Sequence, residues 1–312
     1  MTSSTPSAVN LALAADHGYL DGLVLVLAGA ARAAPSVAFQ AYVLDCGMGD
    51  DQWHRLEYLV SQRLPRVQCT RIPVSARQLE PFAPPVRRLH LNNSTYARFL
   101  LAELLPDIDR IIYLDCDLLI DADLSPLFTL DLAGRLVGAV PDRNVPLLAR
   151  TLPDWELTER EKEMPAFNAG IMLMDLSALR RADLIASIAP SIPRLQSVLQ
   201  SQAVLNYVLR DRWLMLPSRW NRQFHLNQIF SPHRDKPDSI WHMFGSMKPW
   251  HFSFHRSAGI VADCHRIWRE CEWKPLHEGQ IRVSDGPRER LKAIRAFVTR
   301  TMHKLSKRAG ML

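Results

Sequence analysis

Asp115 and Asp117 are two carboxylates one residue apart, and they directly follow the apolar segment Ile111–Leu114. If that segment is a strand of an open α/β sheet, the two acids lie beyond its carboxyl end, where such sheets bind their ligands. Carboxylate oxygens are hard ligands that suit Mg²⁺ or Mn²⁺, and a pair of them leaves coordination positions for phosphate oxygens. The pair therefore predicts a divalent-metal site.

The D-x-D spacing is weak evidence by itself, because it also occurs at Asp107–Asp109 and at Asp121–Asp123. The first of these pairs lies in a turn before the strand, and the second follows a further apolar step. Only the middle pair directly ends a strongly apolar strand. Taken alone, that pair is explained equally well by two acidic residues of a solvent-exposed turn and by a metal site.

A second candidate segment, Trp241–His251, combines an imidazole, a glycine, a lysine and a rigid Pro-Trp step. His242 is a potential metal ligand, Gly245 permits close approach of the backbone, and Lys248 is a point charge suited to phosphate. A single histidine in an apolar segment is more often a structural residue. The metal-ligand interpretation of His242 therefore depends on its meeting the acidic pair in the fold.

These residues need a scaffold, and the chain alternates apolar strands with helical segments. Strands and helices that alternate at these lengths predict an α/β fold, with a parallel sheet covered by helices on both faces. We expect strands at 9–15, 39–44, 67–72, 111–114, 136–140, 170–174 and 240–244, and helices at 20–34, 50–64, 94–105 and 200–209. Segment 81–93 is expected to be a surface loop, and segment 154–165 a lid or an idle loop.

The composition is that of a globular protein, with 47% hydrophobic and 22% charged residues among 312. The five cysteines are odd in number and form no C-x-x-C pair, which argues against a disulfide framework or a structural zinc site. The N-terminal residues lack the pattern of a signal peptide, and the most apolar stretch, residues 20–34, is too short to span a bilayer. We therefore expect a cytoplasmic protein.

The net charge of +6 is confined to the C-terminal tail. After residue 281 there are nine Lys or Arg and two acids, which leaves 29 basic and 30 acidic residues in the rest of the chain. Residues 288–308 have apolar side chains at helical spacing among basic ones, which predicts an amphipathic helix. Near an anionic membrane each basic group contributes about 1 kcal/mol, so we expect peripheral membrane contact. Docking on the body or on a partner is the alternative, and nucleic-acid binding is not expected.

Several separate motifs, in the same order along the chain, resemble those of retaining glycosyltransferase family 8. This group contains glycogenin and the bacterial galactosyl- and glucosyltransferases of lipopolysaccharide assembly. The resemblance covers most of the chain, from about Val9 to His251. The segments that carry it are Ala14–Tyr19, Ser94–Arg98, Asp115–Asp117, Phe167–Gly170 and the H-x-x-G-x-x-K-P-W segment His242–Trp250.

The resemblance implies a GT-A-type, Rossmann-like nucleotide-sugar-binding domain with a mostly parallel central sheet. We expect this catalytic domain in residues 1–275 and the basic tail in residues 276–312. The resemblance also implies a UDP-sugar donor and Mn²⁺ (or Mg²⁺), with Asp115, Asp117 and His242 as the metal ligands. The residues that it places at the donor are Ala14, Asp16, Tyr19, His90, Arg98, Asp115, Gly245 and Lys248.

Family membership further implies retention of configuration at the anomeric carbon. Asp142 and Asn168 are expected to orient the donor sugar, and Gln202 to lie near its reactive face. Because the amide of Gln202 is neutral, it is badly suited to act as a nucleophile. Front-side attack by the acceptor within a short-lived ion pair is therefore the more economical expectation.

The chain departs from the family at Ser201, where active members usually carry the first acid of a D-Q-D or D-Q-x segment. Losing a carboxylate that orients sugar hydroxyls is expected to alter donor choice, lower the rate, or both. Gly18, where some relatives have Asn, is a lesser departure.

The sequence thus predicts a metal-dependent retaining hexosyltransferase that acts on a saccharide or lipid-linked acceptor. The resemblance favours cell-surface polysaccharide or lipopolysaccharide synthesis at the inner face of the cytoplasmic membrane. A degenerate family member that binds a nucleotide-sugar with little or no turnover is the alternative. A sugar nucleotidyltransferase also uses strand-end carboxylates and a metal, but it fits the segment around His242 badly.

Overall fold

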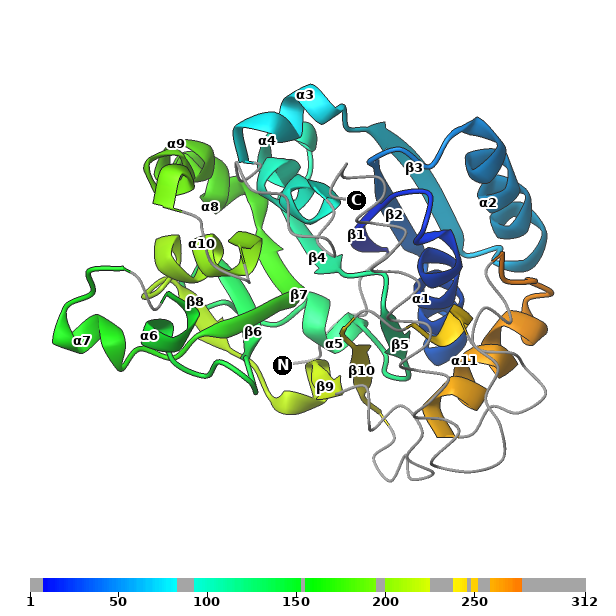
Figure 1. Cartoon of the computed structure of the whole chain (residues 1–312). Coiled ribbons are helices and arrows are strands. Elements are labelled where there is room, and N and C mark those ends of the chain that lie inside the picture. Colours follow the sequence, from blue (N-terminus) through cyan, green and yellow to red (C-terminus); the bar gives the residue numbers. More distant parts are fainter. Residues whose placement is uncertain are drawn as a thin grey trace, which may run out of the picture.

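The computed structural model describes residues 8–82, 93–152, 155–194, 200–224, 238–245, 248–251 and 259–276. A seven-stranded sheet runs through the molecule in the order β3-β2-β1-β4-β7-β6-β8, and a three-stranded sheet has the order β5-β10-β9 (Figure 1). The strands are β1 Val9–Ala15, β2 Phe39–Asp45, β3 Val67–Pro73, β4 Arg110–Leu114, β5 Leu118–Ile120, β6 Val137–Pro141, β7 Phe167–Asp175, β8 Trp213–Met215, β9 Arg222–Phe224 and β10 Ile240–Met243.

The large sheet is mostly parallel, as the sequence predicts. The pairings β1–β2, β2–β3, β1–β4 and β6–β8 are parallel, whereas β7 runs antiparallel to both of its neighbours, β4 and β6. The β1 and β4 ends that carry Ala15 and Asp115 therefore point to the same edge of the sheet, where α/β folds bind ligands.

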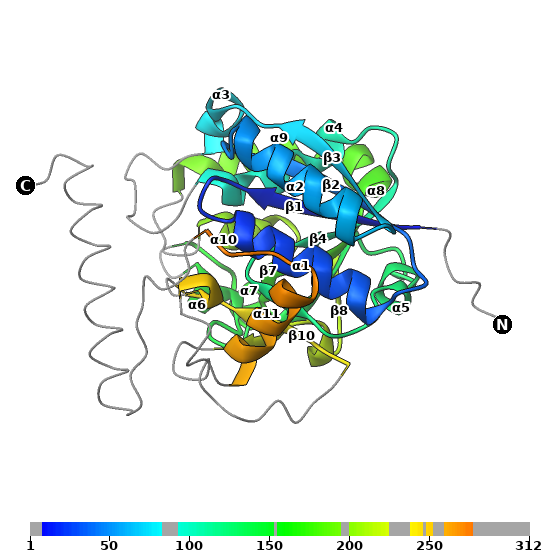
Figure 2. The same ribbon diagram turned by 90° about the vertical axis from the view of Figure 1, so that its right-hand side faces the viewer.

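Two hydrophobic cores lie on the two faces of this sheet, because successive strand residues point to opposite sides. In β1, Leu11 and Leu13 belong to one core and Ala12 belongs to the other. Helices α1, α2 and α11 cover the first face, and α4, α8, α9 and α10 cover the second (Figures 1 and 2). The α/β architecture is thus confirmed.

The helices differ in length, and the two longest flank the strands at the N-terminal end of the chain. The α-helices are α1 Leu20–Ala33, α2 Asp50–Arg63, α3 Ala76–Leu79, α4 Leu101–Leu104, α5 Ser125–Phe128, α6 Leu148–Thr151, α7 Glu159–Lys162, α8 Leu176–Arg181, α9 Leu184–Ile188, α10 Gln200–Val208 and α11 Gly259–Glu270. The 3₁₀ helices are η1 Glu80–Phe82, η2 Asn93–Leu100, η3 Ala189–Arg194, η4 Ser218–Trp220 and η6 Pro249–His251.

Helix α11 packs against α1, and the buried side chain of Asp21 in α1 stabilises this contact. The carboxylate of Asp21 accepts hydrogen bonds from Nε1 of Trp273 (2.9 Å) and from the backbone N–H of Leu276 (2.9 and 3.0 Å). Its backbone carbonyl accepts a third from Nε1 of Trp268 (3.1 Å). Asp21 itself is fully buried. Residues 268–276 are therefore an integral part of the fold.

The structure differs from the sequence predictions in several short elements. The expected helix 94–105 is the 3₁₀ helix η2 followed by one turn of α-helix, α4. Within the described part of segment 154–165, Thr158 and Glu161 form a capping box that starts α7, and Glu161 pairs with Arg210 at 2.7 Å. Strands β8 and β9 and helices α8, α9 and α11 were not expected. Except for α11, each of these elements spans at most six residues, which is too short for a clear periodic pattern.

Two sequence predictions lie outside the described residues: His90 in the expected surface loop, and the amphipathic helix 288–308. Among the described helices, none combines the length and the apolar character that a membrane crossing requires.

Candidate active site

The two predicted metal-ligand segments meet through strand pairing. Strand β5 begins directly after Asp117, and it pairs antiparallel with β10 so that Leu118 lies opposite His242. The backbone N–H of Met243 also donates to the carbonyl of Asp117 (2.9 Å). This pairing brings the imidazole beside the strand-end acids although more than a hundred residues separate them. Ligand atoms of Asp115, Asp117 and His242 all lie within 4.8 Å of one another.

The acids present their oxygens to one side of the imidazole. Nε2 of His242 lies 3.2 Å from Oδ1 of Asp117 and 4.0 Å from Oδ2 of Asp115. Oδ1 of Asp117 is buried, and no described residue donates a hydrogen bond to it. A buried carboxylate oxygen without a donor is costly, and coordination of a cation is one way to offset that cost.

Lys248 supplies a fixed positive charge at the same place. Its Nζ lies 2.5 Å from Oδ2 of Asp117 and also donates to the carbonyl of Met243 (3.1 Å). Burial opposes charge on both groups, but their attraction dominates. The pKa of Asp117 is therefore held below its usual value by the adjacent ammonium of Lys248, and the pKa of Lys248 is raised by Asp117.

Asp115 is oriented by two donors from the opposite side. Its Oδ1 accepts hydrogen bonds from Nη2 of Arg98 (2.9 Å) and from the hydroxyl of Tyr113 (2.9 Å). The other guanidinium nitrogens of Arg98 donate to the carbonyls of Ala169 and Thr95. Since Oδ1 is occupied in this way, Oδ2 is left to face His242.

A chain of carboxamides continues from His242 into the protein. Nδ1 of His242 lies 3.2 Å from Oδ1 of Asn221, and Nδ2 of Asn221 donates to Oδ1 of Asn168 (2.9 Å). Nδ2 of Asn168 donates to Oδ2 of Asp142 (3.1 Å). The same carboxylate oxygen accepts from Nε2 of Gln202 (2.9 Å), whose Oε1 accepts from the N–H of Ala169 (3.1 Å).

The direction of each hydrogen bond in this series of carboxamides follows from Asp142. Both of its oxygens accept hydrogen bonds, Oδ1 from the N–H groups of Asn144 and Val145, so Asn168 must turn its NH₂ toward it. Oδ1 of Asn168 then requires a donor from Asn221, which leaves the oxygen of Asn221 facing Nδ1 of His242. Nδ1 therefore carries the hydrogen, and in the neutral imidazole the lone pair lies on Nε2, toward the two acids.

Two glycines allow the segments to approach this closely. A Cβ on Gly170 would lie 2.3 Å from Cε1 of His242 and 2.9 Å from Oδ2 of Asp115. A Cβ on Gly22, in α1, would lie 2.1 Å from the carbonyl of Cys116 and 2.7 Å from the ring of Trp250. Neither position has room for a side chain. Helix α1, the acidic turn and the Lys-Pro-Trp segment are thus in direct contact.

The turn after β1 adjoins this cluster. Oδ1 of Asp16 accepts from the N–H of Gly18 (2.8 Å), and burial raises the pKa of Asp16. The ring of Tyr19 packs edge-on against Trp250 at 5.7 Å and lies 6.0 Å from Nζ of Lys248. The carbonyl of Ala14 accepts from the thiol of Cys116 (3.4 Å). Ala14 and Tyr19, two of the residues predicted to bind the sugar donor, therefore border the metal-ligand cluster, and Asp16 lies in the turn between them.

The remaining predicted residues are placed as follows. Gly245 follows β10 with φ of +105°, a conformation that favours glycine. Ser201 is half-buried at the start of α10, next to Gln202. Sequence reasoning missed Asn221 and Tyr113, which orient predicted ligands. The only sequence signal was a pair of carboxamides, Asn221 and Gln223, at the alternate spacing of a strand.

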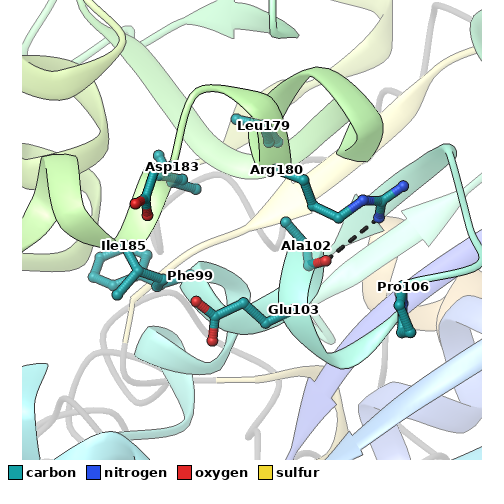
Figure 3. A pocket seen from close by; sticks show the side chains of 9 residues that line it. Phe99, Ala102, Glu103, Pro106, Leu179, Arg180, Asp183 and Ile185 are labelled. Atoms are coloured by element: carbon teal, nitrogen blue, oxygen red, sulfur yellow. Dashed lines mark hydrogen bonds between the residues drawn. The ribbon is translucent and has the colours of Figure 1, made fainter.

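A surface hollow elsewhere is separate from this cluster (Figure 3). It lies between α4, α8 and α9, and none of the predicted site residues lines it. Arg180 at its edge donates to the carbonyls of Ala102, Leu105 and Ile108, so its guanidinium holds these elements together. The hollow therefore offers no basis for catalysis.

The sequence profile of Glycosyl transferase family 8 matches residues 10–253. The chain belongs to this family. General stress protein A of Bacillus subtilis is 28% identical to this family 8 glycosyltransferase over 229 residues, which are 67% of this chain and 75% of that protein. The lipopolysaccharide 1,2-glucosyltransferase of Escherichia coli is 24% identical over 259 residues, 80% of this chain and 74% of that one.

Two further similarities bear on the extent of the fold. Glycosyltransferase GlyF of Streptococcus pneumoniae is 28% identical over 195 residues, but the aligned part is only 44% of its length and 60% of this chain. A crystal structure of the galactosyltransferase LgtC with donor and acceptor sugar analogues superposes with a TM-score of 0.67 and 25% identity. It covers 85% of this family 8 chain and 95% of LgtC. The GT-A type of fold is thereby confirmed.

Proposed function

We propose that this chain is a metal-dependent retaining glycosyltransferase that moves a hexosyl group from a UDP-sugar to a saccharide or glycolipid acceptor. The observation that carries the metal dependence is the pair of facing acceptors, Nε2 of His242 and Oδ1 of Asp117, 3.2 Å apart. Two lone pairs at this distance repel each other unless a cation lies between them. The donor set of two carboxylates and one imidazole suits Mn²⁺ or Mg²⁺.

Asp115, Asp117 and His242 would hold the cation, and the bound cation would supply Lewis-acid stabilisation of the diphosphate leaving group. Lys248 is fixed beside them, and its positive charge would stabilise the negative charge that develops on the phosphate oxygens of the leaving group. The turn Ala14–Tyr19 would hold the nucleoside, since it borders Lys248 and Trp250. Gly245 would let the backbone approach the diphosphate. Arg98 would act at the donor through Asp115, which it orients.

Asp142, Asn168 and Gln202 would bind the donor sugar. Both polar atoms of the Gln202 amide are engaged, with Asp142 and with the backbone of Ala169, which supports an orienting role rather than nucleophilic attack. The acceptor oxygen would then bond to the anomeric carbon on the face that the leaving group departs from, as the sugar-phosphate bond breaks. The hydroxyl proton would pass to the departing UDP, and the configuration would be retained. Water must be excluded during this step, or the donor is hydrolysed.

The name of one relative supports a proposal for the class of acceptor. The name of the Escherichia coli relative supports an acceptor of the lipopolysaccharide class. We propose action in the cytoplasm, with the catalytic domain in residues 1–275 and the basic tail 276–312 in contact with anionic lipid through 288–308. Removing the residues after Pro287 should reduce sedimentation with anionic vesicles and leave donor binding intact; unchanged sedimentation would refute the membrane contact.

A panel of UDP-sugars with Mn²⁺ tests the catalytic proposal. We expect slow UDP release with one preferred sugar, acceleration by the correct acceptor, and no release after Mn²⁺ is chelated. Release that is equally fast in the presence of a chelator would contradict the metal dependence.

A second candidate function, nucleotide-sugar binding with little turnover, is favoured by Ser201, which stands where the family usually has an acid. UDP binding without release from any sugar of the panel would support it. In that case Ser201→Asp should restore release, because it returns the carboxylate next to Gln202; Ser201→Asn is the control of similar size without the charge.

A further inference from the structure

Asn221 is the residue through which the metal-ligand cluster and the carboxamide chain are joined. We propose that Asn221 is a positioning residue that fixes the tautomer and the direction of His242 and ties this ligand to Asn168. Metal binding and the orientation of the sugar-facing groups would then depend on one shared hydrogen-bonded side chain. This inference rests on the proposed metal-dependent transfer.

The backbone holds Asn221 rigidly beside His242. Asn221 ends the 3₁₀ helix η4, where its N–H donates to the carbonyl of Ser218 (3.1 Å). Strand β9, which starts at the next residue, pairs in parallel with β10. Asn221 is only 2% exposed and His242 only 3% exposed, so water does not compete freely for their hydrogen bonds.

The position requires a side chain that accepts and donates at once. The Asn221 oxygen must accept from Nδ1–H of His242, and its NH₂ must donate to Oδ1 of Asn168, whose NH₂ is already committed to Asp142. Aspartate offers the acceptor without the donor, and leucine offers neither. An amide of this length is therefore the matching group.

Without the acceptor, the opposite tautomer becomes favourable. An N–H on Nε2 can donate to Oδ1 of Asp117 at 3.2 Å, which removes the lone pair that a metal ion would bind. Hydrogen bonds to the second nitrogen of a metal-binding histidine commonly set its tautomer, and their loss lowers metal affinity by about 10- to 100-fold.

Three variants separate the two roles of Asn221. Asn221→Leu removes both hydrogen bonds at similar volume, and Asn221→Asp keeps the acceptor and removes the donor. Asn206→Leu is the matched control for the tautomer and for Mn²⁺ affinity, because Asn206 is equally buried and its amide bonds to the backbone of Phe167 and Gln202 rather than to His242. Circular dichroism establishes that each protein is folded.

The first readout is independent of activity: ¹⁵N NMR of the histidine side chains in the metal-free protein, with the His242 signal assigned by its loss in His242→Gln. The wild type, Asn206→Leu and Asn221→Asp should show the Nδ1–H tautomer, and Asn221→Leu the Nε2–H tautomer. Mn²⁺ affinity, measured by the EPR signal of free Mn²⁺, should fall about 10- to 100-fold in Asn221→Leu.

Asn221→Asp should retain Mn²⁺ affinity within a few fold of the wild type and lower kcat for UDP release by about 10-fold, since it cannot donate to Asn168. An unchanged tautomer and unchanged Mn²⁺ affinity in Asn221→Leu would overturn the proposal. If Asn221→Leu does not fold, a loss of Mn²⁺ affinity in Asn221→Asp as large as that in His242→Gln would overturn it. Should the wild type bind no Mn²⁺, the proposed function fails, while the tautomer comparison still decides the role of Asn221.

Discussion

The metal end and the carboxamide end of the site use opposite means to hold polar groups inside the protein. At the metal end, two carboxylates, an imidazole and Lys248 meet, and Oδ1 of Asp117 has no hydrogen-bond donor among the described residues. At the carboxamide end, each amide oxygen and nitrogen of Asn168, Asn221 and Gln202 has a partner. The first end has a surplus of acceptors, which is what the proposed cation site requires, whereas the second is preorganised.

This difference predicts which side chains respond to the metal ion and which respond to the sugar donor. A network whose members are all satisfied is rigid and keeps its geometry when a ligand arrives. A cluster with a surplus of acceptors gains most of its stabilisation from the cation itself. We therefore expect substitutions at the metal end to change metal affinity, and substitutions at the carboxamide end to change turnover.

The largest effect is expected for Asp117→Asn. The substitution removes a ligand charge and leaves the buried Lys248 without its ionic partner. Mn²⁺ affinity should fall by more than about 100-fold, and metal-free stability by about 3 kcal/mol, as when one partner of a buried ion pair is removed. EPR and thermal unfolding measure the two quantities.

Asp121→Asn is the control for that variant. Asp121 belongs to another D-x-D pair and bonds to Arg32 at a partly exposed site. It should leave Mn²⁺ affinity unchanged. An equal loss of affinity in both variants would mean that general charge, rather than ligation, attracts the metal.

An intermediate effect is expected for Gly170→Ala, which lies between the two ends. The N–H of Gly170 donates to Oδ1 of Asn168, and its carbonyl accepts from the N–H of Asp115. The new methyl group would displace His242, so Mn²⁺ affinity should fall by about 10- to 100-fold. Isothermal titration calorimetry of the metal measures the change.

Gly138→Ala, in the neighbouring strand β6, provides the matched control. There a Cβ would meet the end of the Leu132 side chain at 3.0 Å, away from both acids. A small loss of thermal stability with normal Mn²⁺ affinity is expected. If Gly170→Ala behaves in the same way, the close packing around His242 is not needed for ligation.

The smallest effect is expected for Asp142→Asn, which keeps the shape of the carboxamide end and removes its charge. The rate of UDP release should fall by about 10-fold, or roughly 1.4 kcal/mol of activation free energy, with Mn²⁺ affinity retained. Steady-state kinetics at saturating metal measures this. A large loss of metal affinity with a normal kcat would contradict the expectation that the carboxamide end affects turnover rather than metal binding.

The sequence predicted that Asp115, Asp117 and His242 come together, because each lies in a strongly patterned segment; their role as metal ligands stays a prediction. The apolar strand before Asp115 marks the sheet edge, and the segment around His242 has an unusual combination of residue types. The fold class followed from the same alternation of strands and helices. The reversed direction of β7 was not predictable, because a run of nine residues with eight buried has no period that distinguishes parallel from antiparallel pairing.

Asn221 escaped prediction for a different physical reason. It acts through tertiary hydrogen bonds to residues 53 and 21 positions away, and nothing in its neighbourhood in the sequence indicates those partners. Arg98 was placed near the donor by family resemblance, but its contacts with Asp115 and two carbonyls depend on how η2 packs against β4 and β7. Its direct contact with a donor stays a prediction.

The buried carboxylate of Asp21 bears on where this enzyme can be shortened. The family profile ends at residue 253, yet Trp273 and Leu276 donate hydrogen bonds to the carboxylate of Asp21. A fragment cut at the profile boundary would lose these donors together with α11, which packs against α1. Asp21 directly precedes Gly22, the glycine that contacts the acidic turn. We therefore expect that a stably folded fragment must extend at least through Leu276.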